Sequence, residues 1–222
     1  MSYISLFSAS IAPLNNPELY EKAYRAVSVE RRSKIDKFRF KKDKCLSLTA
    51  EILLRSALES IGENFDEMSL SYGENGKPYF EDRPDICFNI SHSGEYALVA
   101  ISDNPVGCDI EKVDEINLNI AKRFYTDGEY HEIIADEKNA KDLFFRYWTV
   151  KESFMKLTGL GMKLPLDAFS TDLNRGIIVG GAPIAGKYYF KEFTIDGYKI
   201  AVASTADTSI AKINYIQLFD CI

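Results

Sequence analysis

Two seven-residue segments of this chain share a hydrophobic pattern although they lie nearly half a chain length apart. Tyr96-Ala-Leu-Val-Ala-Ile-Ser102 is echoed 102 positions later by Tyr198-Lys-Ile-Ala-Val-Ala-Ser204. Each is a short apolar run of the kind that fills a buried strand, and each comes after a first strand, short helices and a long helix. This order predicts an α+β fold of two similar halves, each burying one face of a small, mostly antiparallel sheet under its long helix. A chance match between two unrelated α+β stretches would give the same pattern.

Periodicity and turn signals predict the elements of both halves. In the first half they predict strands over residues 3–11, 68–72, 78–80, 86–90 and 96–102, and helices over 17–26, 30–38 and 43–61. In the second half they predict strands over 106–111, 169–173, 187–193, 198–204 and 213–219, and helices over 117–124 and 139–157. Thr126 and Glu129 form a capping box for one further helix. Asn75-Gly76 and Ser91-His92-Ser93-Gly94 are predicted as hairpin turns.

The segment Asp103-Asn104-Pro105 has the turn-forming composition of a boundary between the halves. We therefore expect an N-terminal domain over residues 1–104 and a C-terminal domain over residues 105–222.

Composition and charge indicate a cytoplasmic protein that binds neither membranes nor nucleic acid in general. The apolar fraction of 46% is ample for a core, no apolar run approaches a membrane span, and the N-terminus lacks the layout of a signal peptide. Four scattered cysteines suit a reducing compartment. The net charge of −6 argues against a general nucleic-acid binder, although residues 31–44 hold eight basic and two acidic side chains. That run indicates either a solvated helix face or a site for a phosphate or an acidic partner.

The segment Val106-Gly-Cys-Asp-Ile-Glu111 predicts a short central strand with two carboxylates on one face. Side chains alternate along a strand, so Asp109 and Glu111 point the same way. Two neighbouring carboxylates repel each other and lose hydration, which a cation between them would offset. Carboxylate oxygens favour hard ions such as Mg²⁺. The alternative is a polar sheet face without a metal.

A second polar stripe lies on the helix predicted around Trp148-Thr-Val-Lys-Glu-Ser-Phe-Met-Lys156. Trp148, Glu152 and Lys156 are spaced four apart and share one helical face. We expect Glu152 to complete the metal site and Lys156 to supply a charge for a phosphate. Taken singly, Glu152 could equally be a surface helix former.

Four blocks of this sequence resemble those of a 4′-phosphopantetheinyl transferase of the surfactin-synthetase-activating type. In chain order they are Gly76-Lys77-Pro78, Phe88-Asn-Ile-Ser91-His92-Ser93, Gly107-Cys-Asp109-Ile-Glu111 and Trp148 to Lys156. Members of that family are pseudo-symmetric pairs of α+β halves with the active site in the cleft between them. The resemblance thus favours a duplication over a chance repeat.

The resemblance also implies a role for each site residue. The implied Mg²⁺ ligands are Asp109, Glu111 and Glu152. The implied contacts to coenzyme A are Gly76, Lys77 and Pro78 at the adenine end, Arg31, Lys34 and Ser47 near the 3′-phosphate, and Ser91, His92 and Lys156 at phosphates. Lys156 and His92 would add positive charge or hydrogen bonds during the reaction. Glu152 or a metal-bound water would deprotonate the acceptor, and the sequence does not choose between them.

The implied reaction is a Mg²⁺-dependent phosphoryl transfer from coenzyme A to an apo acyl or peptidyl carrier protein. A carrier serine attacks the β-phosphate and 3′,5′-ADP leaves, so the protein positions reactants and neutralises charge. We expect a monomer, because the internal repeat takes the place of a dimer interface.

Two other functions fit parts of the same pattern. A Mg²⁺-dependent phosphohydrolase acting on coenzyme A or a nucleotide would need the same acids but no carrier protein. A non-catalytic module that binds coenzyme A or a carrier would have no need of three carboxylates. A serine hydrolase built on Ser91 or Ser93 is disfavoured, because neither residue lies in a G-x-S-x-G elbow.

Overall fold

The computed structural model describes residues 2–180 and 184–221. The elements of the first half are β1 (Ile4–Ser10), α1 (Pro17–Ala26), α2 (Val29–Ile35), α3 (Lys41–Glu59), β2 (Leu70–Tyr72), β3 (Pro78–Phe80), β4 (Cys87–Ser93) and β5 (Tyr96–Ser102). Those of the second half are β6 (Val106–Lys112), α4 (Ala121–Phe124), α5 (Asp127–Ala135), α6 (Ala140–Thr158), β7 (Phe169–Asp172), β8 (Ile177–Gly180), β9 (Gly186–Ile195), β10 (Tyr198–Ser204) and β11 (Lys212–Tyr215). None of the helices described here is long and apolar enough to span a membrane.

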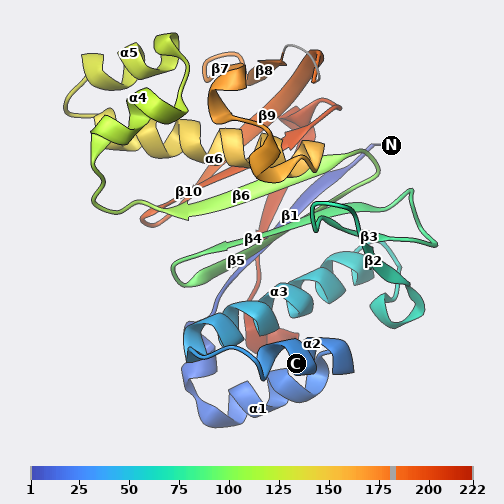
Figure 1. Cartoon of the computed structure of the whole chain (residues 1–222). Coiled ribbons are helices and arrows are strands. Elements are labelled where there is room, and N and C mark those ends of the chain that lie inside the picture. Colours follow the sequence, from blue (N-terminus) through green and yellow to red (C-terminus); the bar gives the residue numbers. More distant parts are fainter. Residues whose placement is uncertain (1, 181–183, 222) are drawn as a thin grey trace.

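The centre of the molecule is four layers in the order α3, first sheet, second sheet and α6, with α1 and α2 packed beyond α3 and α4 and α5 beyond α6 (Figure 1). One sheet has the order β11-β1-β5-β4, and the other has the order β6-β10-β9-β8-β7. One apolar core lies between the first sheet and α3, and a second lies between the other sheet and α6. A third joins the inner faces of the two sheets. Each sheet thus buries both faces, which accounts for the apolar runs in β5 and β10.

The two halves repeat each other in register as well as in element order. Strand β5 pairs antiparallel with β1, and β10 pairs antiparallel with β6. Ser102 faces Ile4 in the first pair and Ser204 faces Val106 in the second, so each partner lies 102 residues after its counterpart. The hydroxyls of both serines donate at 2.8 Å to the carbonyl that precedes the paired strand. The predicted pair of similar α+β halves is therefore confirmed.

Several predicted boundaries need correction. Ser91, His92 and Ser93 belong to β4, and the turn to β5 consists of Gly94 and Glu95 alone. Gly94 has φ +56°, a conformation that glycine adopts without strain. Strand β8 was not predicted.

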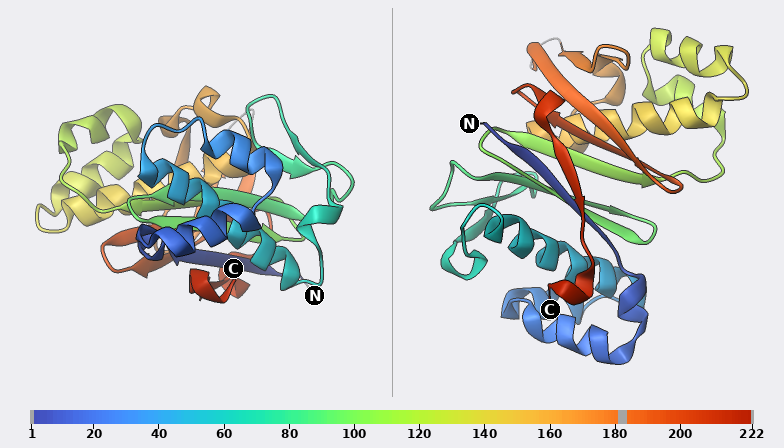
Figure 2. Two further views of the ribbon diagram at one scale, coloured as in Figure 1. Left: turned by 90° about the horizontal axis from the view of Figure 1, so that it is seen from below. Right: turned by 180° about the vertical axis from the view of Figure 1, so that it is seen from behind.

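The last strand differs most from its prediction. Strand β11 ends at Tyr215, and a 3₁₀ turn (Leu218–Asp220) takes up much of the rest of the predicted strand over 213–219. Strand β11 also pairs in parallel with β1, so it belongs to the sheet of the first half. Figure 2 shows this final segment, in red, crossing from one half to the other. The division into domains 1–104 and 105–222 stays a prediction.

Gly107 allows β6 to approach α6 at backbone distance. A Cβ at this position would clash with the Ser153 carbonyl oxygen and the Leu157 nitrogen, both backbone atoms of α6. Backbone atoms inside a helix cannot move aside cheaply, so only glycine fits here. The glycine of the G-x-D-x-E block therefore fixes the distance between the strand and the helix that carry the predicted site.

We predict that Gly107→Ala lowers the free energy of unfolding by about 1–3 kcal/mol, since the helix must shift away from the strand. Gly128→Ala is the matched control, because Gly128 lies in α5 with open space around its Cα. Alanine is the better helix former, so the control should be neutral or slightly stabilised. Urea unfolding followed by circular dichroism measures both, and equal stability of the two variants would contradict the close-approach argument.

Candidate active site between the two halves

The site is built where β4 and β6, the neighbouring edge strands of the two sheets, run side by side. Three alternate side chains of β4 accept hydrogen bonds from three alternate backbone N–H groups of β6. The pairs are Cys108 N to Asn89 Oδ1 (2.9 Å), Ile110 N to Ser91 Oγ (3.4 Å) and Lys112 N to Ser93 Oγ (3.1 Å). Side chains of one sheet therefore satisfy the free edge of the other.

The same serines hold the two carboxylates of β6. Ser91 Oγ donates to Asp109 Oδ1 at 2.8 Å, and Ser93 Oγ donates to Glu111 Oε2 at 2.8 Å. From α6, Lys156 Nζ reaches Asp109 Oδ1 at 2.6 Å and Ser91 Oγ at 2.8 Å. The structure thus places Asp109 and Glu111 on the same face of β6 and pairs Asp109 with Lys156 of α6.

Burial dominates the electrostatics of this carboxylate cluster. Asp109 is 2% exposed, and burial raises its pKa while the Lys156 ammonium opposes that rise. Burial, and after it the charge of Asp109, also raises the pKa of Glu111 and of Glu152. The three carboxylates are therefore neighbours that compete for positive charge.

The donor set fits a hard cation in chemistry but is not gathered into a coordination shell. Asp109 Oδ2 is buried and has no hydrogen-bond partner within residues 2–180 and 184–221. Across the same residues, no three His, Cys, Asp or Glu side chains are grouped closely enough to hold a metal ion. An orphaned carboxylate oxygen beside two further acids suits Mg²⁺.

Lys151, which precedes Glu152 in the W-x-x-K-E block, faces the opposite way into the core. Its ammonium is fully buried and binds Glu129 at 2.8 Å, together with the carbonyl oxygens of Leu166 and Phe169. Glu129 also completes the predicted capping box with Thr126. Lys151 thus anchors α6 to its neighbours and is not part of the candidate site, whereas the adjacent Glu152 is.

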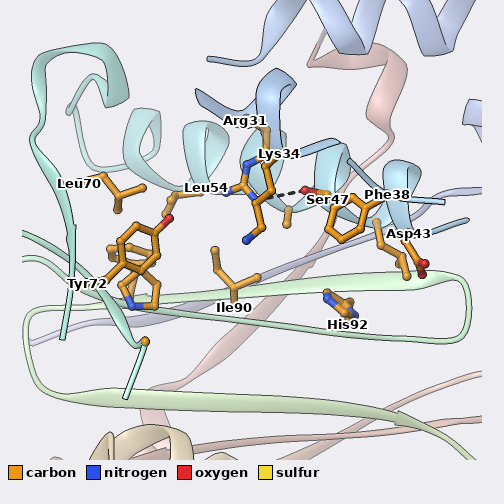
Figure 3. A pocket seen from close by; sticks show the side chains of 15 residues that line it. Arg31, Lys34, Phe38, Asp43, Ser47, Leu54, Leu70, Tyr72, Ile90 and His92 are labelled. Atoms are coloured by element: carbon orange, nitrogen blue, oxygen red, sulfur yellow. Dashed lines mark hydrogen bonds between the residues drawn. The ribbon is translucent and has the colours of Figure 1, made fainter. Parts of the chain in front are cut away.

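A cavity of about 270 Å³ lies on the other face of β4, toward α2 and α3 (Figure 3). Six of the predicted coenzyme A contacts line it, and these are Arg31, Lys34, Ser47, Gly76, Pro78 and His92. The rest of its wall is largely apolar and includes Leu54, Tyr72 and Ile90. In Figure 3, Arg31 and Lys34 extend from α2 into the cavity, and a hydrogen bond of 3.2 Å joins Arg31 Nη1 to Ser47 Oγ.

His92 projects into this cavity because it alternates with Ser91 along β4. Its side chain is open to the cavity, yet the surrounding walls desolvate the ring and lower its pKa below the ordinary value near 6.5. Lys156 on the far side of the strand lowers the pKa further. The surroundings of His92 therefore favour the neutral imidazole.

Two of the predicted coenzyme A contacts are used inside the protein. Lys77 Nζ donates to the carbonyl oxygens of Val106 (3.1 Å) and Leu157 (3.0 Å), so it joins the β2–β3 hairpin to the other half. Ser91 Oγ donates once and accepts twice, which exhausts the capacity of a hydroxyl. Ser91 Oγ therefore has no capacity left for a phosphate in this arrangement, whereas the Lys77 ammonium keeps one of its three N–H donors.

A second, smaller cavity adjoins the first and reaches Lys156. It lies between the halves and is lined by the hairpin, by β4 and by the C-terminal end of α6, including Lys156. Gly76, Pro78 and Ile90 line both cavities, so the two are adjacent. A ligand that fills the first cavity can therefore extend toward Lys156.

The sequence did not predict that Asn89 and Ser93 hold the neighbouring strand. Both hold β6, and Ser93 orients Glu111. The available signal is the polar alternation Asn89-x-Ser91-x-Ser93, which has the period of a strand rather than of a turn.

Comparisons with known proteins identify the family of this chain. A model described as 4′-phosphopantetheinyl transferase, N-terminal, matches residues 15–104, and one described as the 4′-phosphopantetheinyl transferase superfamily matches residues 105–203. The 4′-phosphopantetheinyl transferase Sfp of Bacillus subtilis (strain 168) is 38% identical over 86% of this chain and 88% of that protein. The 4′-phosphopantetheinyl transferase psf-1 of Bacillus pumilus is 34% identical over 77% of this chain and 76% of that protein.

Among solved structures, a Thermotoga maritima holo-[acyl-carrier-protein] synthase aligns with a TM-score of 0.39 and 15% identity, over 45% of this chain and 61% of that one. The family assignment does not depend on this partial likeness, because the sequence relatives cover most of both chains. This chain therefore belongs to the 4′-phosphopantetheinyl transferase family, which confirms the family and the enzyme class that its four sequence blocks predicted.

Proposed function

We propose that this protein transfers the 4′-phosphopantetheine arm of coenzyme A to a serine of an apo acyl or peptidyl carrier protein. The observation that carries the proposal is the adjacency of two features. One is a cavity lined by Arg31, Lys34 and His92, and the other is the carboxylate cluster behind Lys156. Coenzyme A has the same layout, with an adenine nucleotide at one end followed by the pyrophosphate whose phosphoanhydride bond breaks.

The larger cavity would hold the nucleotide end. Its apolar wall suits a base, and the cationic side chains of Arg31 and Lys34 suit the 3′-phosphate. The pyrophosphate would then lie toward the smaller cavity, where Lys156 offers a further charge. Gly76 and Pro78 line both cavities and would contact the ligand through backbone and ring atoms.

Asp109, Glu111 and Glu152 would hold Mg²⁺. Their oxygens are the ligands that this ion prefers, and Asp109 Oδ2 has no protein partner among the residues described. When bound, the ion would neutralise charge on the pyrophosphate.

The remaining chemistry belongs to the side chains of this chain. The carrier serine oxygen forms a bond to the β-phosphorus, and the bond from that phosphorus to the bridging oxygen breaks, releasing 3′,5′-ADP. Glu152 is partly exposed and makes no side-chain hydrogen bond within the described residues, so it is free to take the serine proton. Lys156 and His92 would stabilise the charge that passes to the leaving group.

We also propose that the protein is a monomer in the cytoplasm that binds neither nucleic acid nor membranes. The candidate site draws on both halves of one chain, so it needs no second copy. Cys45, Cys87, Cys108 and Cys221 are all free, which suits a reducing compartment.

Asp109→Asn should reduce transfer about a hundredfold or more, because it removes the charge that Lys156 faces and a proposed metal ligand. The measurement is the intact mass of an apo carrier protein after incubation with the variant, coenzyme A and Mg²⁺. The matched control is Asp142→Asn, which removes a carboxylate from the same helix as Lys156 but from a half-exposed ion pair with Lys199.

Three outcomes of this experiment are informative. A gain of one phosphopantetheine arm with wild type and the control, but not with Asp109→Asn, supports the proposal. Unchanged turnover by Asp109→Asn would rule out its role. Consumption of coenzyme A by wild type without a mass gain on several carriers would point to a phosphohydrolase instead.

Mg²⁺ binding should be visible without turnover. Trp148 is the only tryptophan and lies one helical turn before Glu152, so its fluorescence can report on the cluster. We expect a saturable change on adding Mg²⁺ to wild type, and at least about tenfold weaker binding in Asp109→Asn and Glu152→Gln. Equal Mg²⁺ affinity in all three proteins would contradict the assignment of these ligands.

Coenzyme A should raise the pKa of His92. The pKa is lowered in the free protein, and a neighbouring phosphate favours the charged imidazolium. The bound state then holds more protons between the two pKa values, so affinity for coenzyme A increases as the pH falls through that window. Proton NMR measures the imidazole titration with and without coenzyme A. His92→Gln assigns its signal, and an unchanged titration midpoint would contradict the phosphate contact.

A further inference from the structure

Glu51, on α3, is a buried carboxylate that belongs to neither the carboxylate cluster nor the cavity wall. Its side chain is 1% exposed. It accepts hydrogen bonds from Ser28 N (2.6 Å), Ser28 Oγ (2.9 Å), Arg31 Nε (3.1 Å), Arg55 Nε (3.2 Å) and Arg55 Nη2 (3.1 Å). A buried carboxylate with this many donors is held in one orientation.

Glu51 determines which edge of the Arg31 guanidinium faces the cavity. The Nε edge points back to Glu51, and Nη1 is held by Ser47. A guanidinium carries five N–H donors, so others are left on the two terminal nitrogens. Nη2 makes no hydrogen bond to any of the residues described, and Arg31 lines the cavity (Figure 3). The edge turned toward the cavity is the one that binds a phosphate bidentately.

The surrounding charges keep that edge positive. Glu51 is shared between Arg31 and Arg55, and Arg55 also pairs with Asp66 at 2.8 Å. Asp66, whose side chain is 66% exposed, supplies a further negative charge to the Arg55 guanidinium. Arg31 pairs with one carboxylate, that of Glu51, and shares it with Arg55. Part of the positive charge of Arg31 is therefore left to attract a ligand.

We propose that Glu51 is a positioning residue for Arg31, and that it sets the preference of the cavity for a ligand with a terminal phosphomonoester. This inference rests on the proposed use of coenzyme A. The ligand pair that tests it is coenzyme A and 3′-dephospho-coenzyme A, which differ only in that phosphate.

The test is Glu51→Gln, an isosteric change that removes the charge. We expect the KM for coenzyme A to rise roughly tenfold, the size of one charged hydrogen bond lost, with little change in kcat. The KM for 3′-dephospho-coenzyme A should stay within about twofold. Asp66→Asn is the matched control, since it weakens the outer end of the same network and should leave the ratio of the two KM values unchanged.

A merely structural role for Glu51 predicts a different pattern, because loss of folded protein affects both ligands equally. Equal changes for the two ligands would therefore overturn the proposal. In an Arg31→Met background, adding Glu51→Gln should cause no further loss of phosphate preference, and an additive loss would count against action through Arg31. If Glu51→Gln does not fold, Glu51→Asp keeps the charge but withdraws the carboxylate from Arg31 Nε, and it should shift the same ratio in the same direction.

Calorimetry with coenzyme A and its dephospho form, without a carrier protein, gives the same ratio as Kd values. If wild type prefers coenzyme A and Glu51→Gln does not, the inference holds even where no transfer is seen. If wild type transfers the arm but Glu51→Gln keeps the full preference, the positioning role is wrong while the proposed function stands.

Discussion

The structure depends on the way in which two sheet edges meet without forming a ladder. A free edge of β6 beside a free edge of β4 could pair directly and merge the sheets into one. Instead, the side chains of Asn89, Ser91 and Ser93 accept the hydrogen bonds of the β6 N–H groups. A side chain between two backbones holds the strands farther apart than a ladder would. The same hydroxyls then reach the carboxylates of β6, so the joint between the halves is also the frame of the site.

Buried lysines join the remaining parts to this frame. Lys77 lies between the two halves. Its ammonium donates hydrogen bonds to carbonyl oxygens at the start of β6 and near the end of α6, and burial lowers its pKa. The carbonyls at a helix C-terminus lack helical partners and carry partial negative charge, so a cation suits them. Asn75 of the same hairpin adds a bond to the Gly159 carbonyl oxygen at 2.9 Å. The first half thus caps α6, the helix that carries Glu152 and Lys156, through the hairpin that also lines both cavities.

The sequence predicted those parts of the site that depend on local spacing. Asp109 and Glu111 share a face because strands alternate, whereas the contact from Lys156 to Asp109 was not predicted, since it depends on the packing of β6 under α6 at Gly107. The sequence did not predict the contacts that depend on residues far away in the chain. The polar run at Ser91 resembles a turn until β6 lies beside it, and the Lys77 ammonium is committed to carbonyls about 30 and 80 residues away. Glu51 gave no signal at all, since a single glutamate in a long helix is usually exposed.

The path of β11 explains why a nearly symmetric molecule has one candidate site. With the offset of 102 residues, β1 is the counterpart of β6, yet Phe7 and Ala9 stand where Asp109 and Glu111 would be. Both are buried in the core under α3. The edge of β1 is covered by β11, which pairs with it in parallel, while Tyr215 of β11 reaches the Thr194 carbonyl oxygen on β9. In the symmetric arrangement β9 would take the place of β4 beside that edge. The last strand therefore covers the edge of β1 with a backbone ladder, whereas β6, the counterpart of β1, keeps a free edge that the side chains of β4 satisfy.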